Sequence, residues 1–387
     1  MIRSFSGAAA LVSSEILDGP VVAVRPQAIT ARASAVMAQF PGDVLYAVKC
    51  NDHPLVLEAL FRGGIRHFDT ASIQEIRTVR RLLPEAVCHF MHPVKSRAAI
   101  AEAYFEHGVR RFVVDHPDEL AKIAEVTKTA DDLEIYVRLA VSGEGALLAL
   151  TGKFGCEADE AVPLLHAARR LAARVGLTFH VGSQCLAPEA FACAVRKAAR
   201  VAVSAGGVDD LDVGGGFPAA YTGNEPAFVA FVAAIRSALA ETGLACRLQC
   251  EPGRLLVADG ASILTNVELR RGRSLYLNDG VYGNLAELKW LGPQFPLRRV
   301  GRAVAPATPV QPYDLFGPTC DSIDSMPGPH WLPADMQGGD WIEVGFMGAY
   351  SNALRTGFNG FSDHHCVILD DAPWCGTPPN AGLRRAA

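Results

Sequence analysis

Short apolar, β-rich runs alternate with longer amphipathic segments from Val21 to about Cys250, and this alternation predicts parallel strands joined by helical crossovers. After an entry strand at Val21–Val24, we expect eight strands at Val44–Val48, Arg66–Phe68, Val87–Met91, Arg111–Val114, Leu133–Leu139, Leu177–Val181, Val208–Val213 and Cys246–Cys250. Helical patterns lie between them at Pro54–Phe61, Ile73–Leu83, Ala98–His107, Asp118–Val126, Glu157–Val175, Phe191–Val203 and Pro226–Glu241. Eight such units predict an α/β fold with a (β/α)8 TIM-like barrel, which usually needs about 250 residues.

The pattern changes after Arg254, where helical periodicity largely disappears. Further β runs, separated by Gly and Pro turns, follow at Ile263–Leu269, Leu275–Leu277, Trp341–Val344 and His365–Leu369. They predict a second, mostly β domain, either a barrel or a sandwich. We therefore expect a barrel domain at 21–258 and a β domain formed by 1–20 and 259–387. Ala10–Val12 is expected to pair into the β domain, and the Pro-containing tail from Asp370 onward to fray.

Composition supports an ordinary globular protein. The chain has 387 residues, of which 50% are hydrophobic and 20% charged, and this length fits two unequal domains. A net charge of -5 without a basic run argues against a nucleic-acid partner, and no apolar run reaches membrane-spanning length. The N-terminus is a poor secretory signal, so a cytoplasmic location is expected. The ten cysteines form no CxxC pair, which favours reduced thiols over disulfides or a structural zinc site.

Polar residues follow the ends of the predicted barrel strands, where active sites gather in this fold. They are Lys49, Asp69, His92, Asp115, Arg138, His180, Gly214-Gly215-Gly216 and Glu251-Pro-Gly-Arg254. Taken singly, each has an ordinary explanation, such as a helix cap for Asp69, a buried core histidine for His180 or a surface charge for Arg254. Their shared position indicates one site.

Lys49 ends the apolar strand Val44–Val48. An amine that loses hydration there would have a lowered pKa, and its unprotonated form can attack a carbonyl to make a Schiff base. The ordinary alternative is a lysine whose stem lies along the strand end while its charge reaches water.

Three other features near the strand ends suit a phosphorylated heterocycle. The glycine triplet Gly214-Gly215-Gly216 would let backbone N–H groups close on an anion, although most glycine triplets are tight turns. Arg254 is able to pair with the same phosphate, and Glu251 to face a heterocyclic nitrogen. Together with Lys49, these residues meet the needs of pyridoxal 5'-phosphate (PLP).

A glycine-rich segment interrupts the barrel pattern at Ala140–Gly155. Such an excursion after the fifth strand would overhang the barrel mouth and could act as a lid. Disorder is the alternative.

An ordered set of motifs resembles the ornithine/diaminopimelate/arginine decarboxylases, PLP enzymes of the alanine-racemase-like fold, and is most similar to the ornithine decarboxylase branch. The resemblance spans about Val21 to Phe361. Its motifs are Tyr46-Ala-Val-Lys49-Cys-Asn51, His180-Val-Gly-Ser183, Asp212-Val-Gly-Gly-Gly216-Phe-Pro218, Glu251-Pro-Gly-Arg254, Asn278-Asp-Gly-Val-Tyr282-Gly283, Gly317-Pro-Thr-Cys320-Asp321 and Gly348-Ala-Tyr350 with Phe358-Asn-Gly-Phe361.

The resemblance implies a role for each matching residue around PLP. Lys49 would hold the cofactor as a Schiff base, His180 would stack on its ring, and Glu251, ionised, would pair with the ring nitrogen. Asp69 and Arg138 would support the site near Lys49. The phosphate would be bound by Ser183, Gly214, Gly215, Gly216, Gly253, Arg254 and Tyr350.

The resemblance also implies a homodimer whose active site lies at the subunit interface. Cys320 and Asp321 would enter from the partner chain, Cys320 to return a proton to Cα and Asp321 to hold the distal ammonium of a diamino acid, with Tyr282 also at the substrate. The implied reaction converts L-ornithine to putrescine and CO2, a step of polyamine biosynthesis. L-lysine and diaminopimelate are alternative substrates.

One departure from the branch concerns the substrate's distal amine. The ornithine branch usually carries a Tyr-Asp pair where this chain has Trp290 and Leu291, so either Glu287 substitutes or Asp321 alone suffices. Two further readings stay open, a catalytically silent regulator on the same scaffold and a metal-dependent hydrolase using His92, His116 and His180. The presence of Lys49, Glu251 and Cys320 argues against a silent regulator. The three histidines lack the sequence spacing of metal ligands, which argues against a metal-dependent hydrolase.

Overall fold

The computed structural model describes residues 2–14, 17–128, 130–292, 294–302 and 308–374, which form two compact units. The barrel unit comprises Arg32–Pro218 and Pro226–Leu255, and the sheet unit comprises Met1–Ala31, Ala219–Glu225 and Leu256–Ala387. The chain passes from the sheet unit to the barrel unit between residues 31 and 32 and returns to the sheet unit between residues 255 and 256. The sequence analysis places these boundaries between residues 20 and 21 and between residues 258 and 259. Those domain boundaries stay a prediction.

Eight parallel strands close the barrel unit, which confirms the predicted (β/α)8 fold. In chain order they are β3 (Asp43–Ala47), β4 (His67–Thr70), β5 (Val87–Phe90), β6 (Arg111–Val114), β7 (Glu134–Leu139), β9 (Arg174–Phe179), β11 (Asp210–Asp212) and β12 (Arg247–Cys250). The ring closes where β12 pairs with β3. All eight carboxyl ends thus point to one mouth, where the predicted site residues of the barrel unit lie.

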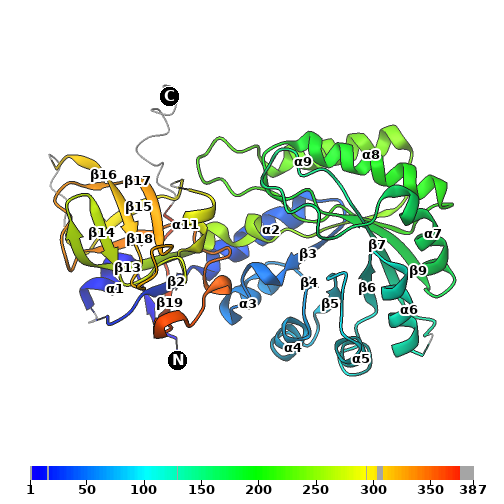
Figure 1. The fold of residues 1–387 in the computed structure, drawn as a ribbon, viewed down its shortest axis with the longest axis horizontal. Coiled ribbons are helices and arrows are strands. Elements are labelled where there is room, and N and C mark those ends of the chain that lie inside the picture. Colours follow the sequence, from blue (N-terminus) through cyan, green and yellow to red (C-terminus); the bar gives the residue numbers. More distant parts are fainter. Residues whose placement is uncertain (1, 15–16, 129, 293, 303–307, 375–387) are drawn as a thin grey trace. The chain divides into compact units, whose positions relative to one another are not determined.

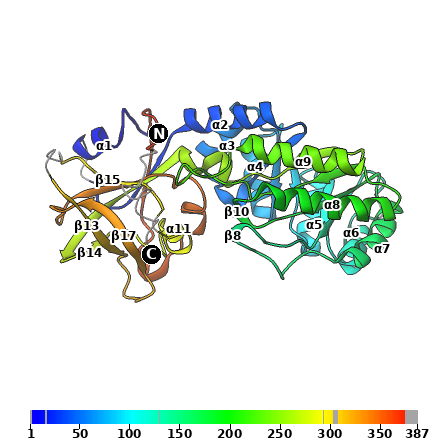
Figure 2. The same ribbon diagram turned by 90° about the horizontal axis from the view of Figure 1, so that it is seen from above.

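Helices cover the outside of these strands, as Figure 1 shows for α4, α5 and α6. The barrel helices are α3 (Pro54–Arg62), α4 (Ile73–Leu82), α5 (Arg97–Phe105), α6 (Pro117–Val126), α7 (Ala158–Arg169), α8 (Pro188–Ser204) and α9 (Phe228–Thr242). The Ser72 and Ser96 hydroxyls cap α4 and α5 by accepting backbone N–H groups at 3.2 Å. Helices α8 and α9 lie side by side in both ribbon views (Figures 1 and 2).

One helix prediction needs correction, and one helix was missed. The helix expected at Glu157–Val175 ends at Arg169, because Val175 and its neighbours form β9, paired with β7 and β11. The sequence prediction also missed α2 (Pro26–Gln39), whose apolar residues are only weakly segregated to one face.

The sheet unit contains a nine-stranded sheet, which confirms the mostly β second fold. The main path runs β1 (Ser4–Phe5), β19 (His365–Leu369), β2 (Val21–Val24), β13 (Ala261–Arg271), β14 (Ser274–Leu277), β16 (Val310–Phe316) and β17 (Ser325–Pro333). Strand β18 (Trp341–Val344) pairs with β13 and with β15 (Leu297–Val300). The sequence prediction missed β15, β16 and β17.

Both ends of the chain contribute to the sheet unit. Ala10–Val12 lies in helix α1 (Ala8–Ser14), not in a strand, and Leu11 packs in a core cluster with Leu264 and Val367. Asp371 accepts a hydrogen bond at 2.8 Å from buried Arg25, so fraying from Asp370 is wrong at this point. The rest of the expected tail, 375–387, lies outside the described residues.

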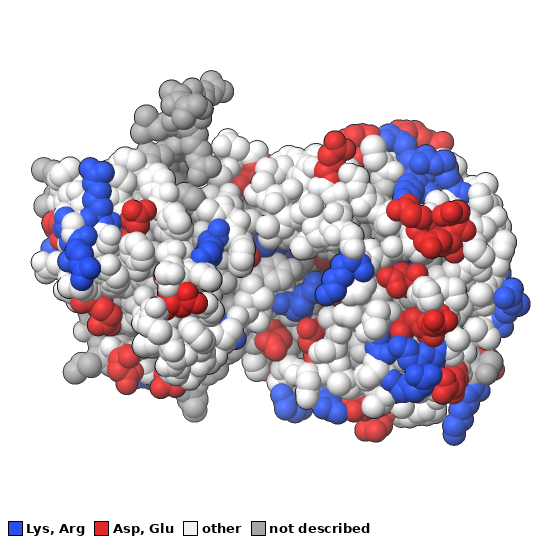
Figure 3. All heavy atoms as spheres, in the orientation of Figure 1, with Lys and Arg blue, Asp and Glu red and all other residues white. Residues whose placement is uncertain are grey.

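Charge on the face drawn in Figure 3 is mixed, with Lys and Arg interleaved with Asp and Glu. Among the described residues, no helix combines the length and apolarity that crossing a membrane requires.

Candidate active site

Lys49 lies at the mouth of the barrel, in the short turn Val48–Cys50 that directly follows β3. Its Nζ is 3.1 Å from Oδ2 of Asp69 on the neighbouring strand β4. The Lys49 side chain is 42% exposed, while that of Asp69 is 2% exposed. The side chain is therefore half exposed, and the two alternatives for Lys49 stay open. A buried carboxylate orients an amine that a ligand can reach.

Glu251 is the first residue after β12, and its side chain is buried. Burial raises the pKa of Glu251 well above its ordinary value, and the nearby carboxylates of Asp212 and Asp69 raise it further. Within the described residues, Glu251 Oε1 has no hydrogen-bond partner. The protein alone thus favours a protonated Glu251, whereas the sequence analysis expects an ionised one. A cationic ring nitrogen would supply the missing positive charge and the missing donor.

His180 follows β9 and faces the same site. The backbone N–H of Gly182 donates to its Nδ1 at 3.0 Å, which places the ring proton on Nε2. Burial, with Lys49 and Arg138 nearby, lowers the pKa of His180 to about 3. The imidazole is therefore neutral, as suits a ring that stacks on an aromatic cofactor.

The three glycines after β11 are required by close approaches. Gly214 and Gly216 have φ values of +65° and +106°, where a side chain is strained. A Cβ at Gly215 would lie 2.6 Å from the Glu251 carbonyl oxygen and 3.2 Å from His180 Nε2. The triplet therefore passes close to both residues, and its lack of side chains keeps the space open.

Ser183, Gly253 and Arg254 come together beside this triplet. Ser183 begins β10 (Ser183–Cys185), and its Oγ accepts a hydrogen bond from Arg254 Nη2 at 3.3 Å. The Arg254 side chain is only 4% exposed. A Cβ at Gly253 would lie 3.0 Å from Cys50 Cβ, next to Lys49. A buried guanidinium, a hydroxyl and glycine backbone form a cradle suited to a phosphate.

The glycine-rich segment 140–155 is folded against the barrel. Its strand β8 (Ala146–Leu148) pairs with β10. The Arg138 guanidinium lies 5.7 Å from the ring centroid of Phe154, and Asp115 accepts the Gly155 N–H at 2.9 Å. Disorder is thus the wrong alternative for these residues, and motion as a lid stays a prediction.

The residues expected at the substrate cluster in the sheet unit. The Tyr282 hydroxyl donates to Asp321 Oδ2 at 2.5 Å, and the Tyr282 ring packs on Phe358 at 4.6 Å between centroids. Cys320 is exposed, and its Sγ lies 3.4 Å from Asn359 Oδ1. Tyr350, expected at the phosphate, also belongs to the sheet unit and has a φ of +54°.

Asp324 is a residue of this cluster that the sequence analysis missed. It accepts hydrogen bonds from Val281 N at 2.7 Å, Thr319 N at 3.1 Å and Thr319 Oγ1 at 2.8 Å. A Cβ at Gly280 or Gly317 would lie only 2.2 or 2.1 Å from Asp324 Oδ1. One carboxylate therefore ties the loop that carries Tyr282 to the loop that carries Cys320 and Asp321. The two glycines, already visible in the motifs, were the available signal.

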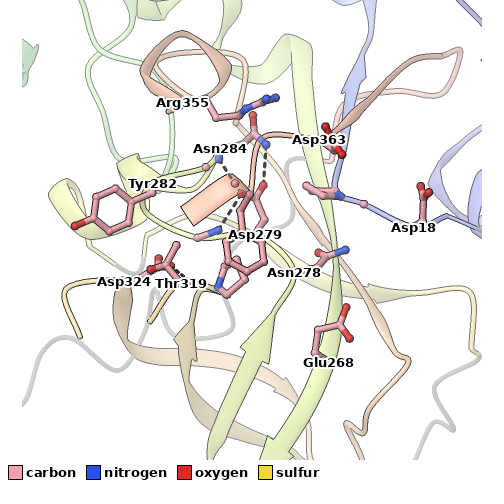
Figure 4. Close-up of a pocket in the computed structure, with 17 residues that line it drawn as sticks. Asp18, Glu268, Asn278, Asp279, Tyr282, Asn284, Thr319, Asp324, Arg355 and Asp363 are labelled. Atoms are coloured by element: carbon pink, nitrogen blue, oxygen red, sulfur yellow. Dashed lines mark hydrogen bonds between the residues drawn. The ribbon is translucent and has the colours of Figure 1, made fainter. Parts of the chain in front are cut away.

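Asp279 fixes the other end of the Tyr282 loop, as Figure 4 shows. It accepts hydrogen bonds from the backbone N–H of Asn284 at 2.9 Å, the Asn284 Nδ2 at 2.8 Å and Gly280 N at 2.9 Å. Burial raises the pKa of Asp279 to about 6. With Asp324, it lines a cavity of about 300 Å³ in the sheet unit.

Replacing Asp324 tests whether it positions the substrate residues. Asp324→Ala should raise the KM for the amino-acid substrate by roughly 10-fold, because the two loops lose their shared acceptor, while PLP affinity stays unchanged. Asp324→Asn keeps an acceptor oxygen and should recover most of the loss. Steady-state kinetics and PLP titration measure both effects. An equal loss in the two variants, or a loss of PLP, would contradict a positioning role.

A metal centre finds no support. Among the described residues, no group of three or more His, Cys, Asp and Glu side chains could hold a metal ion. His92 instead packs edge-on against Phe154, with 5.2 Å between ring centroids, and the His116 ring accepts the Asp118 N–H at 3.1 Å as a helix cap.

Comparison with known proteins assigns the family. The family described as "Pyridoxal-dependent decarboxylase, pyridoxal binding domain" matches residues 27–258, which include the barrel mouth. The chain belongs to this decarboxylase family. PLP is accordingly its cofactor, and the unpaired Glu251 oxygen and the Ser183–Arg254 cradle fit that group.

Individual relatives agree with this assignment. The lysine/ornithine decarboxylase of Selenomonas ruminantium is 32% identical over 85% of this chain and 84% of its own length. An ornithine decarboxylase of Panagrellus redivivus is 33% identical over 89% of this chain and 84% of its own length. The crystal structure of the Paramecium bursaria Chlorella virus arginine decarboxylase bound to agmatine superposes with a TM-score of 0.83. The two sequences are 26% identical, and the superposition covers 93% of this chain and 99% of the arginine decarboxylase chain.

Proposed function

We propose that this enzyme decarboxylates a basic L-amino acid, most specifically L-ornithine, to yield putrescine and CO2. The observation that carries the proposal is the Tyr282–Asp321 pair. The Tyr282 hydrogen bond, followed by the backbone N–H of Ile323, lowers the pKa of the Asp321 carboxyl. Asp321 is therefore held ionised and in a fixed position, as recognition of a distal ammonium requires. The names of the relatives in Selenomonas and Panagrellus support the same substrate class.

The barrel residues would bind and orient the cofactor. Lys49 would join PLP covalently, with Asp69 holding its amine in place. His180 would stack on the ring as a neutral imidazole, and Glu251 would accept a hydrogen bond from the protonated ring nitrogen. Bound PLP supplies an electron sink for the pair of electrons left at Cα when CO2 departs. The phosphate would lie against Ser183, Gly214, Gly215, Gly216, Gly253, Arg254 and Tyr350.

Two residues of the sheet unit would complete the reaction. Cys320 is exposed and would deliver the proton that Cα needs after CO2 leaves. Asp321 would hold the distal ammonium. At the positions of the missing Tyr-Asp pair, Trp290 in helix α11 (Ala286–Trp290) is 60% exposed, whereas Glu287 is 3% exposed. A buried Glu287 is poorly placed to bind substrate, which favours Asp321 acting alone.

A substrate panel tests the choice of amino acid. We expect CO2 release to be fastest with L-ornithine, then with L-lysine, and slow with arginine and diaminopimelate. Asp321→Asn should raise the KM for ornithine by roughly 10- to 100-fold, because a charge-assisted contact is lost. Asp363→Asn, an exposed acid of the same unit, is the control and should have no effect. The proposal is wrong if ornithine ranks last.

We also propose a homodimer in which Cys320 and Asp321 serve the partner's Lys49. Mixing Lys49→Ala with Cys320→Ala protein tests this sharing. Random exchange of subunits should restore about a quarter of wild-type activity, since half of the dimers would carry one intact site of two. Two inactive variants that stay inactive after proven subunit exchange would contradict the shared site. The cytoplasmic location stays a prediction from the sequence.

A further inference from the structure

Two buried carboxyl groups meet at the mouth of the barrel. Asp212 ends β11, and Glu251 follows the neighbouring strand β12. Asp212 is aligned with Gln249, and residues two apart on a strand point to the same side. The Val213 N–H donates to Gln249 O at 2.9 Å, and the Glu251 N–H to Gly214 O at 2.8 Å. The ladder therefore continues up to the two acids and brings their side chains to one place.

Asp212 and Glu251 each have a carboxyl oxygen that receives no hydrogen bond from the part of the chain that the structure describes. Asp212 is fully buried and Glu251 is 7% exposed. One Asp212 oxygen accepts the Gly214 N–H at 2.8 Å, but Asp212 Oδ2 and Glu251 Oε1 have no hydrogen-bond donor among the described residues. The strand alignment nevertheless places the two carboxyl groups side by side on neighbouring strands. Two carboxylates are both acceptors, so this contact is favourable only when one of them carries a proton.

Electrostatics also favours one proton on the pair. Burial raises the pKa of Asp212 to about 6 and that of Glu251 well above its ordinary value, and each group is affected by the other. Two like charges this close and this deeply buried cannot both be retained at neutral pH without a large cost. A single shared proton removes the repulsion and leaves a net charge of minus one on the pair.

We infer that Asp212 and Glu251 act as one unit, sharing a single proton and presenting a single negative charge to the ring nitrogen of PLP. Asp212 is a positioning residue in this unit. It donates to one Glu251 oxygen and leaves the other free to accept from the ring nitrogen. The inference rests on the proposed placement of the PLP ring beside Glu251.

Three variants test the unit through PLP affinity, measured by titrating the apo-protein, and through the absorbance of bound PLP. Asp212→Asn still donates to an ionised Glu251, so its Kd should stay within about 3-fold of wild type. In Glu251→Gln the charge moves to Asp212, and the loss should be about 10-fold. The double variant has no charge left and should lose more than the product of the two, on the order of 100-fold or more.

An infrared measurement adds a readout that needs only the single variants. In wild-type apo-protein, the carbonyl band of the protonated carboxyl group should lie at a low frequency because its proton is shared, and this band should shift in Asp212→Asn and in Glu251→Gln, where the partner carboxyl group is replaced. Asp118→Asn, an exposed acid on helix α6 of the same unit, is the control and should retain the band and the PLP affinity.

The outcomes separate the inference from the proposed site. Additive losses in the double variant, a severe loss in Asp212→Asn alone, or absence of the band in wild type would overturn the shared proton. If none of the three variants changes PLP affinity or absorbance, the ring does not lie beside Glu251. In that case it is the proposed cofactor placement that fails.

Discussion

Lys49→Ala should abolish decarboxylation, with kcat/KM falling roughly 1,000-fold or more, because the only amine that we place at the cofactor is lost. The purified variant should also lose the visible absorbance of covalently held PLP. Non-covalent contacts at the Ser183–Arg254 cradle would remain, so some PLP should still bind and be removed easily by dialysis. Absorbance spectra and single-substrate kinetics measure both effects.

Lys122→Ala is the matched control for this variant. Lys122 is a partly buried lysine of the same unit that pairs with Glu119, away from the proposed site. It should retain the absorbance and the activity of wild type. If Lys49→Ala keeps the covalent absorbance, another lysine carries PLP. If wild-type protein itself binds no PLP, the alternative of a catalytically silent regulator becomes the better interpretation.

Cys320→Ala should lower kcat by about 100-fold or more while leaving PLP absorbance intact, because a general acid is removed but no cofactor contact is. The residual reaction should release CO2 without returning the proton cleanly to Cα, so the yield of diamine per CO2 should fall. Quantifying both products in the same reaction separates slow chemistry from a misdirected proton.

Cys193→Ala provides the control, because Cys193 is also exposed but lies on helix α8 of the barrel unit. It should have wild-type kinetics and product ratio. Full activity with a normal diamine yield in Cys320→Ala would remove the proton-donor role from Cys320.

The barrel could be predicted because its strands are short, apolar and regularly spaced, and each ends in a polar residue. Position alone placed Lys49, Asp69, His180 and Glu251 at one mouth, and the structure brings them together. The helix α2 and the strands β15 to β17 were missed because their sequences lack strong periodicity. Pairing with other strands, which no local pattern encodes, stabilises β15, β16 and β17.

Other features depended on side-chain geometry that a sequence does not contain. The sequence left open whether the Lys49 amine is desolvated or reaches water, and only the structure shows a half-exposed side chain partnered by Asp69. Asp324 was missed because its role depends on two glycines brought next to it by folding. Likewise, Asp212 belongs to a glycine motif in the sequence, which does not indicate its neighbour in space. Only the alignment of β11 with β12 shows that it lies beside Glu251.

The central claim is that Lys49 holds PLP covalently, and borohydride reduction followed by peptide mass spectrometry tests it most directly. Reduction fixes any lysine-bound cofactor as a stable adduct, and protease digestion then locates it. We expect a single pyridoxyl adduct on the peptide that contains Lys49. An adduct on Lys95, Lys153 or any other lysine, or no adduct from protein that retains PLP absorbance, would contradict it.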